Sequence, residues 1–124
     1  MAVSSIPIIS IVDDDESLRE ALESLFKSVG YKTEVFASAE DFLRSDYHHE
    51  TKCLILDIRM PGMSGLELQR RLVAAGSRIP IIFITAHADE EARAQAVAAG
   101  AVACLRKPFS EDALLSAVQS ALRA

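Results

Sequence analysis

Charged and hydroxyl side chains stand at the ends of several short apolar runs in this 124-residue sequence, and these residue types are suited to chemistry. If the runs are parallel strands of one sheet, their carboxyl ends meet at one edge, where ligands bind in open α/β sheets. The residues are Asp13, Asp14 and Asp15 after the first run, Asp57 and Thr85 at the ends of two others, and Lys107 after the last.

Carboxylates gathered at one site repel one another, and they do not all stay ionised at neutral pH without a cation between them. Mg²⁺ (or Mn²⁺) suits such a site, because it takes oxygen ligands from one or two carboxylates, waters and phosphate oxygens. Beside the ion, a carboxylate can attack a phosphoryl group and form an acyl phosphate. Lys107 would then face the phosphoryl oxygens as a point charge, and Thr85 would donate one hydrogen bond.

Each of these residues also has an ordinary structural explanation. An aspartate after a strand most often caps the next helix, and Asp15 or the nearby Ser17 could have that role. Asp57 alone could be a loop residue, Thr85 a plain strand residue, and the Lys-Pro pair at residues 107–108 a surface turn. Their joint placement at one sheet edge is what favours a functional site.

The apolar pattern predicts five strands that alternate with five helices. Short runs rich in Ile and Val indicate buried parallel strands, and helical spacing of apolar residues indicates the helices. The expected strands cover residues 6–12, 33–36, 53–58, 79–85 and 101–105, and the expected helices cover 18–29, 38–43, 64–76, 89–99 and 110–122. Because parallel strands need crossover helices, the fold class is α/β, a doubly wound sheet covered on both faces. The pattern does not give the order of the strands.

Size, charge and cysteine content restrict the function classes. A chain of this length fits a single domain, residues 1–124. The net charge of −5 disfavours direct contact with nucleic acid. No run reaches the ~20 apolar residues of a membrane span, and no basic N-terminal region indicates a secretory signal, so a cytoplasmic location is expected. Cys53 and Cys104 lie in apolar stretches and are expected to be free thiols.

Four segments together resemble the receiver domains of two-component response regulators, and the resemblance runs from Ile9 to Leu122. The segments are IVDDDE (11–16), LILDIRMPGMSGLEL (54–68), IPIIFITAHAD (79–89) and AAGAVACLRKPF (98–109). LDIRMPGMSG and KPF are similar to the same segments in regulators of the FixJ type. The resemblance implies a flavodoxin-like (CheY-like) five-stranded parallel sheet in the order 2-1-3-4-5, with five helices.

The resemblance also implies roles for the acidic residues. Asp57 is similar to the family's phospho-acceptor. Asp13 and Asp14 resemble the acidic pair that binds Mg²⁺ (or Mn²⁺), with Asp14 as a direct ligand and Asp13 acting largely through water. The backbone carbonyl of Arg59 falls where the family has its third protein ligand, beside the carboxylates of Asp14 and Asp57.

Thr85 resembles the family's switch hydroxyl, and Lys107 the lysine that pairs with the acceptor or its phosphate. The peptide bond from Lys107 to Pro108 is expected to be cis, as in the family. One position departs from the family, which usually has Tyr or Phe where Cys104 stands. Either the aromatic part of the switch is lost, or Cys104 packs where a ring would and Thr85 still reshapes the loop that follows it.

Arg59 and His87 each lie two residues after a site residue, at positions that in the family flank the phosphoryl group and tune its lifetime. The alternative is that both are solvated loop side chains. His48 and His49 fall in an expected polar loop, so we expect them to be exposed and to be neither phospho-relay histidines nor metal ligands.

A receiver of this kind implies a sensor histidine kinase as its phosphate donor. It is not expected to be an enzyme beyond self-catalysed phosphoryl acceptance and autodephosphorylation. The output surface is expected on the helix at residues 89–100, the fifth strand and the last helix, with Val97, Val102 and Leu122 as apolar contacts.

The FixJ-like motifs favour a fragment of a longer regulator. Its own C-terminal output domain would bind DNA and control transcription, with a homodimer forming on phosphorylation. The receiver itself is expected to touch neither nucleic acid nor a membrane.

Two alternatives remain open. A stand-alone receiver would act by binding a protein target directly. An aspartyl-nucleophile phosphatase on a similar sheet would be a function of another class. That class typically has an acid–base aspartate two residues after the nucleophile, where Arg59 stands here.

Overall fold

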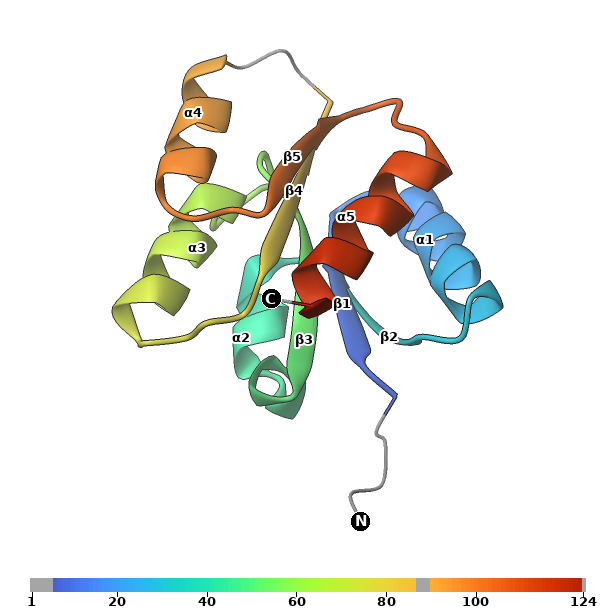
Figure 1. Ribbon diagram of the computed structural model, residues 1–124. Helices are drawn as coiled ribbons and strands as arrows, with labels where there is room; N and C mark the ends of the chain where they lie inside the picture. The colour runs from blue at the N-terminus through green and yellow to red at the C-terminus, as the bar shows by residue number, and fades with distance from the viewer. Residues whose placement is uncertain (1–5, 87–89, 124) are drawn as a thin grey trace.

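The computed structural model describes residues 6–86 and 90–123. Strands and helices alternate along the chain as the sequence predicts, with one short 3₁₀ helix in addition (Figure 1). The elements are β1 (Ile8–Val12), α1 (Glu16–Ser28), β2 (Lys32–Phe36), α2 (Ala39–Arg44), η1 (Asp46–His49), β3 (Thr51–Asp57), α3 (Gly65–Ala74), β4 (Ile81–Thr85), α4 (Glu90–Ala98), β5 (Ala103–Arg106) and α5 (Glu111–Arg123). None of the helices in this described part of the chain has the length and apolar content that a membrane span needs.

All five strands form one parallel sheet in the order β2-β1-β3-β4-β5, which confirms the predicted fold class and strand order. The chain first adds β2 on one side of β1 and then crosses over to add β3 on the other side. The carboxyl ends of β1 and β3 therefore form the switch point at which open α/β sheets bind their ligands.

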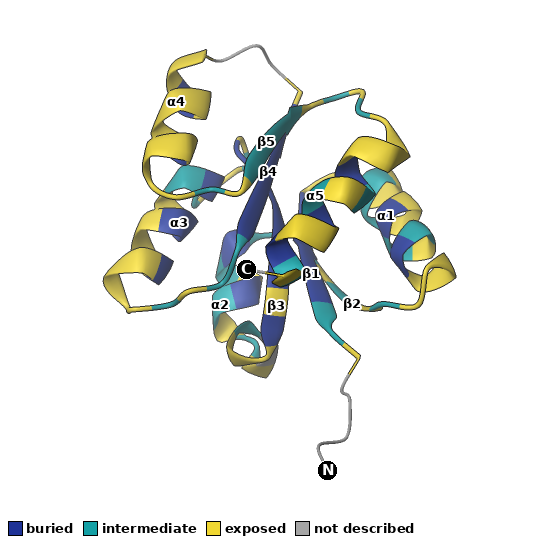
Figure 2. Cartoon of the chain, viewed as in Figure 1, coloured by how far each residue is buried: buried dark blue, intermediate teal, exposed yellow. Residues whose placement is uncertain are grey.

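Helices cover both faces of the sheet, α1 and α5 on one and α2, α3 and α4 on the other (Figure 1). Alternate side chains of each strand enter opposite cores: Cys53 and Ile55 of β3 pack with α1 and α5, whereas Leu54 and Leu56 pack under the other three helices. Figure 2 shows the central strands buried and the outer helix faces exposed. The sheet is thus a rigid, two-sided platform for side chains at the ends of its strands.

The central strands have the continuous apolar runs that burial on both faces requires. All five residues of β4 are buried, and so are six of the seven residues of β3. The edge strands β2 and β5 are only partly buried. The strands that end at Asp57 and Thr85 are therefore the most firmly packed part of the domain.

Side-chain caps fix where the helices begin. Asp15 is the N-cap of α1, and its carboxylate accepts hydrogen bonds from the backbone N–H groups of Ser17 (3.0 Å) and Leu18 (3.3 Å). Ser64 and Glu67 form a capping box at the start of α3. Asp15 therefore caps the helix, and Asp13 and Asp14 are the two aspartates of this run that can contribute to a site at the edge of the sheet.

Three strands begin later than the sequence predicts. β1 begins at Ile8 rather than at residue 6. β4 begins at Ile81 rather than at residue 79, because Pro80 has no backbone N–H to donate to a neighbouring strand. β5 begins at Ala103 rather than at residue 101, because the N–H of Ala101 bonds to the carbonyl of Ala96 (3.0 Å) at the end of α4.

Residues 46–49 form a 3₁₀ helix instead of the expected polar loop, and the expected exposure of His48 was wrong. His48 is half-buried; its Nδ1 lies 2.7 Å from the carbonyl oxygen of Ser45, and its ring packs edge-on against Phe42. His49 is exposed, as expected. This histidine pair lies at the amino end of β3, away from the switch point.

α4 is attached differently at its two ends. Near its C-terminal end, the buried amide of Gln69 on α3 donates a hydrogen bond to the carbonyl oxygen of Ala96 (3.1 Å). In its first turn, Glu90 forms an exposed ion pair with Arg106 of β5, with 3.5 Å between the charged atoms. The C-terminal end of α4 is therefore held by a buried hydrogen bond, whereas its first turn combines the buried Ala92 with an exposed ion pair.

Candidate functional site

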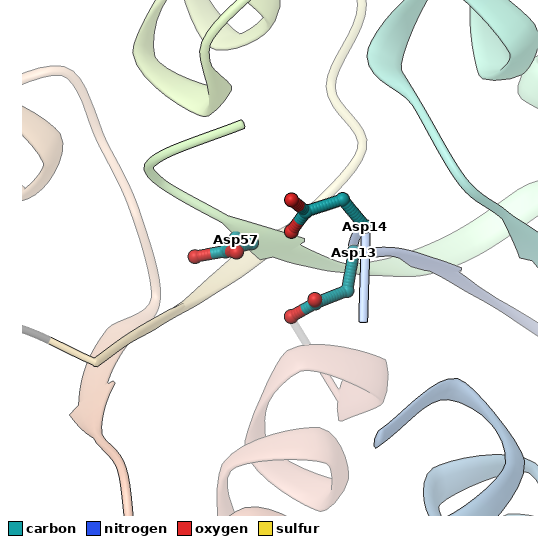
Figure 3. Close-up of side chains that lie close together, drawn as sticks. All are labelled: Asp13, Asp14 and Asp57. Carbon is teal, nitrogen blue, oxygen red and sulfur yellow. The ribbon is translucent and has the colours of Figure 1, made fainter. Parts of the chain in front are cut away.

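Three carboxylates converge at the switch point of the sheet (Figure 3). Asp13 and Asp14 follow the last residue of β1, and Asp57 is the last residue of β3, the strand next to β1. One carboxylate oxygen from each residue lies within 4.8 Å of the other two. Asp13 and Asp57 are buried, whereas Asp14 is exposed to solvent. The predicted joint placement of these carboxylates is thus what the structure shows.

Asp13 is fully buried and has a partner for each of its polar groups. Its Oδ1 accepts a hydrogen bond from the backbone N–H of Asp15 (2.8 Å), and its Oδ2 accepts one from the Lys107 amine (3.1 Å). Its carbonyl accepts a hydrogen bond from the Arg19 guanidinium (2.7 Å), and its own N–H donates to the carbonyl of Phe36 (3.2 Å). These contacts fix the carboxylate in place at the floor of the site.

Lys107 lies across the site from the acidic residues. Its backbone N–H donates to the carbonyl of Thr85 (2.8 Å), which ties the segment after β5 to the end of β4. Its Nζ lies 3.1 Å from Asp13 and 3.9 Å from Asp57. The bond from Lys107 to Pro108 is cis, which confirms that prediction. A single partly buried ammonium thus faces both buried carboxylates.

The environment of Asp57 raises its pKa from 3.8 to about 6. Burial is the largest cause, and the like charge of Asp13 adds to it, with a smaller contribution from Asp14. The ammonium of Lys107 and a hydrogen bond from the backbone of Arg59 act in the opposite direction. The pocket therefore disfavours a third negative charge unless further positive charge enters it.

Arg59 and Thr85 lie at the same edge of the sheet as Asp57, and their roles as carbonyl ligand and switch hydroxyl stay predictions. The backbone of Arg59 hydrogen-bonds the carboxylate of Asp57, so the residue is in place beside the acceptor. Thr85 is buried at the end of β4, next to the strand that carries Asp57. His87 lies outside the described residues.

Cys104 is half-buried on β5 and packs against the core under α2, α3 and α4. Burial raises the pKa of its thiol, the charge of Arg93 lowers it by a smaller amount, and the charge of Glu90 raises it slightly. A small side chain therefore stands beneath α4 at the position where the family resemblance leads one to expect a ring.

Gly65 is part of the site's construction that the sequence reasoning did not single out. A Cβ on this residue would lie 2.2 Å from the carbonyl oxygen of Asp57, and its N–H donates to the carbonyl of Ile58 (2.9 Å). Only glycine therefore lets the start of α3 fold back onto the end of β3. The available signal was a glycine directly after the Ser64 cap, since glycine is a poor helix former.

The donor set fits a hard divalent cation. Three clustered carboxylates with one lysine leave net negative charge, and oxygen ligands of this kind are those that Mg²⁺ and Mn²⁺ prefer. The raised pKa of Asp57 is the electrostatic sign of the same excess charge. Asp13, Asp14 and Asp57 are the side chains that would hold such an ion.

The fold and the site together define a flavodoxin-like α/β domain with an acidic pocket at its switch point. The model of the response regulator receiver domain family matches residues 9–119. The chain belongs to this family, the receiver modules of two-component systems.

Individual relatives agree with this assignment. The response regulator protein TodT of Pseudomonas putida is 48% identical over 116 residues, which are 94% of this chain and 51% of that protein. The transcriptional regulatory protein FixJ of Bradyrhizobium diazoefficiens is 37% identical over 115 residues, 93% of this chain and 56% of that protein. The solved structure of FixJ-N matches with a TM-score of 0.86 at 34% identity and covers 97% of this chain and 96% of its own. The predicted resemblance to FixJ-type receivers is therefore confirmed, and the chain spans about half the length of these full-length relatives.

Proposed function

We propose that this domain is a phosphorylation switch in which Asp57 accepts a phosphoryl group from a sensor histidine kinase. The observation that carries the proposal is the position of Asp57. It is buried at the switch point, within 4.8 Å of carboxylate oxygens of Asp13 and Asp14, with the Lys107 amine 3.9 Å away. Ionisation of this buried carboxyl destabilises the metal-free fold. Phosphoryl transfer requires carboxylates and a cationic side chain held together in this way.

The proposed ion is Mg²⁺ (or Mn²⁺), held by Asp13, Asp14, Asp57 and the backbone carbonyl of Arg59. When bound, it neutralises the charge of the carboxylates and of the incoming phosphoryl oxygens. The remaining positive charge comes from Lys107, already oriented by its contact with Asp13 (3.1 Å).

In the transfer step, a carboxylate oxygen of Asp57 attacks the phosphorus of a phosphohistidine. The new O–P bond forms as the P–N bond breaks, and the imidazole leaves. The Lys107 ammonium pairs with the phosphoryl oxygens, and the Thr85 hydroxyl donates a hydrogen bond to one of them. Asp57 is mostly ionised at neutral pH despite its pKa of about 6, so the nucleophile is available.

The phosphoryl group adds about two negative charges and three acceptor oxygens at the end of β3, beside the end of β4. Movement of Thr85 toward it would bias α4 and β5 between two arrangements, so we place the output surface on α4, β5 and α5. Val97 and Val102 are exposed there, and Leu122 is half-buried, packed against the core under α1 and α5.

Because Cys104 stands where the family usually has an aromatic ring, we propose that the conformational change depends on Thr85 and α4 rather than on rotation of a ring. Arg59 and His87 are proposed to tune the lifetime of the phosphoryl group.

The whole protein is proposed to be a cytoplasmic transcription regulator, of which this chain is the single receiver domain. Its relatives are about twice as long, and the similar FixJ is named a transcriptional regulatory protein. A C-terminal DNA-binding domain would act on DNA, with a homodimer forming on phosphorylation, while this acidic domain contacts neither DNA nor a membrane. A stand-alone receiver that binds a protein target is the alternative.

Phosphorylation of the isolated domain tests the proposal. Acetyl phosphate with Mg²⁺ should add about 80 Da, the mass of one phosphoryl group, in a form that hydroxylamine removes. Asp57→Asn should abolish the addition, and Asp46→Asn, an exposed aspartate at the opposite end of β3, should not. Persistence of the mass in Asp57→Asn would overturn the assignment. We propose no turnover of external substrates; hydrolysis of a phosphomonoester at about 1 per second or faster would instead indicate a phosphatase.

A further inference from the structure

The loop between β3 and α3, residues 58–64, carries Arg59. At its start, the N–H of Ile58 donates to the carbonyl of Ile84 on β4 (3.2 Å), and two further contacts hold the rest of the loop. At its end, the N–H of Gly65 donates to the carbonyl of Ile58 (2.9 Å) and closes the loop. Also near its end, the N–H of Met63 donates to Oε2 of Glu40 (3.1 Å). Glu40 belongs to the first turn of α2, so this second contact joins the loop to a different layer of the molecule.

The Glu40 carboxylate lies directly against the loop backbone. Gly62 has a φ of +75°, a conformation that favours glycine. A Cβ added at Gly62 would come within 2.6 Å of Oε2 of Glu40. The left-handed turn at Gly62 and the missing side chain together leave room for this carboxylate to reach the N–H of Met63.

The second oxygen of Glu40 is buried without a hydrogen-bond partner among the described residues. Burying an unpaired carboxylate oxygen costs free energy, so an uncharged side chain at this position would be easier to bury. Glu40 is therefore poorly explained as a contact selected for stability alone. Its one described hydrogen bond is to the loop that starts at the phospho-acceptor strand.

We propose that Glu40 is a positioning residue: it latches the β3–α3 loop so that the backbone of Arg59 is held ready for the divalent cation. The inference rests on the proposed function, because it assigns the latch to the same metal site. Arg59 already bonds the Asp57 carboxylate through its backbone, and the latch fixes the far side of that loop. Met60 and Met63 also pack on the core, so loss of the latch loosens the loop without unfolding it.

Three variants separate the latch from charge and from helix stability. Glu40→Ala removes the acceptor, whereas Glu40→Gln keeps a side-chain carbonyl for the N–H of Met63. Asp41→Ala is the matched control, because this exposed neighbour carries the same charge on the same helix turn and pairs only with Arg44 among the described residues.

The first measurement is amide hydrogen exchange in metal-free protein. We expect the Met63 amide to exchange at least about fivefold faster in Glu40→Ala, as loss of a hydrogen bond to a charged acceptor implies. Glu40→Gln and Asp41→Ala should stay within about twofold of the wild type. Unchanged protection in Glu40→Ala would overturn the latch itself.

The second measurement is Mg²⁺ affinity, followed by titration with the chloride salt. Glu40→Ala should weaken binding about fivefold, an effect of the size of one such hydrogen bond, with Glu40→Gln and Asp41→Ala near the wild type. If Glu40→Ala and Asp41→Ala weaken Mg²⁺ binding equally, the loss of one negative charge explains the effect, and the positioning role is overturned. If the wild type does not bind Mg²⁺, the proposed function fails, while the exchange measurement still decides the latch.

Gly62→Ala gives an independent perturbation of the same contact. Its methyl group should displace the Glu40 carboxylate, so the variant should weaken Mg²⁺ binding in the wild-type background. In the Glu40→Ala background the same change should have a smaller effect, because the carboxylate is already absent. Additive effects of the two substitutions would contradict the proposal.

Discussion

Replacing Asp57 with asparagine should stabilise the metal-free protein at neutral pH. Burial, and then the like charges of Asp13 and Asp14, raise the pKa of Asp57 from 3.8 to about 6. Ionising this carboxyl is therefore harder in the folded chain than in the unfolded chain. Asparagine has nearly the same shape and no charge, so the variant avoids this destabilisation.

The size of the effect follows from the pKa. A rise from 3.8 to about 6 corresponds to about 3 kcal/mol, at about 1.4 kcal/mol per pKa unit. Below about pH 3 the carboxyl is protonated in both the folded and the unfolded chain, so the destabilisation vanishes. Between about pH 3 and 6 the unfolded chain loses its proton first, so wild-type stability falls as pH rises, and above about pH 6 the loss is nearly constant. We expect Asp57→Asn to exceed the wild type by about 1–3 kcal/mol at about pH 7.5, the lower value allowing for solvent screening, and to equal it at about pH 3.

Urea unfolding with a chelator present, repeated across this pH range, measures the difference directly. Asp46→Asn serves as the control and should show no comparable pH-dependent gain, because this residue is exposed at the other end of β3. Added Mg²⁺ should stabilise the wild type more than Asp57→Asn, since the variant lacks one of the three carboxylates. A difference that stays constant from about pH 4 to 8, or a variant less stable than the wild type at about pH 7.5, would refute the electrostatic account.

Three further substitutions, with Gly76→Ala as a control, test other parts of the domain. Lys107→Ala should lower metal-free stability by about 3 kcal/mol in urea unfolding, because Asp13 then keeps a buried charge without its ammonium partner; no loss would contradict this. Gly65→Ala should lower stability by about 1–3 kcal/mol through overpacking on the β3 backbone, and should slow phosphorylation. Gly76→Ala, which meets no atom within 4 Å, should leave phosphorylation unchanged. Cys104→Tyr should increase phosphorylation-dependent dimerisation, measured by sedimentation, if this position couples the site to the output surface; an unchanged dimer would make the cysteine a packing choice.

The acidic cluster could be predicted because its members are set by strand ends. Asp13 and Asp57 follow apolar runs that had to be buried parallel strands, and parallel strands deliver their carboxyl ends to one edge. Lys107 followed from the same logic. The order of the strands did not, since periodicity shows which face of a strand is buried and not which strand is its neighbour.

The contacts that hold the cluster in place could not be predicted. Arg19 reaches the carbonyl of Asp13, and Glu40 reaches the N–H of Met63 from a residue 23 positions earlier. Such contacts depend on how layers pack rather than on any local pattern. Gly65 could be predicted only in part. Its position after a capping serine is visible in the sequence, but its close approach to the β3 backbone depends on tertiary packing.

The described polar contacts of α4 are buried at its C-terminal end and exposed at its first turn. The carbonyl oxygen of Ala96 accepts hydrogen bonds from the buried amide of Gln69 and from the N–H of Ala101. Moving the C-terminal end of α4 would therefore break these hydrogen bonds. The first turn is joined to β5 by the exposed pair of Glu90 and Arg106, which water and salt replace at little cost. Rearrangement of the Glu90–Arg106 pair would therefore cost less than loss of the contacts at Ala96, so we expect the polar contact of the first turn to change more readily than those at the C-terminal end.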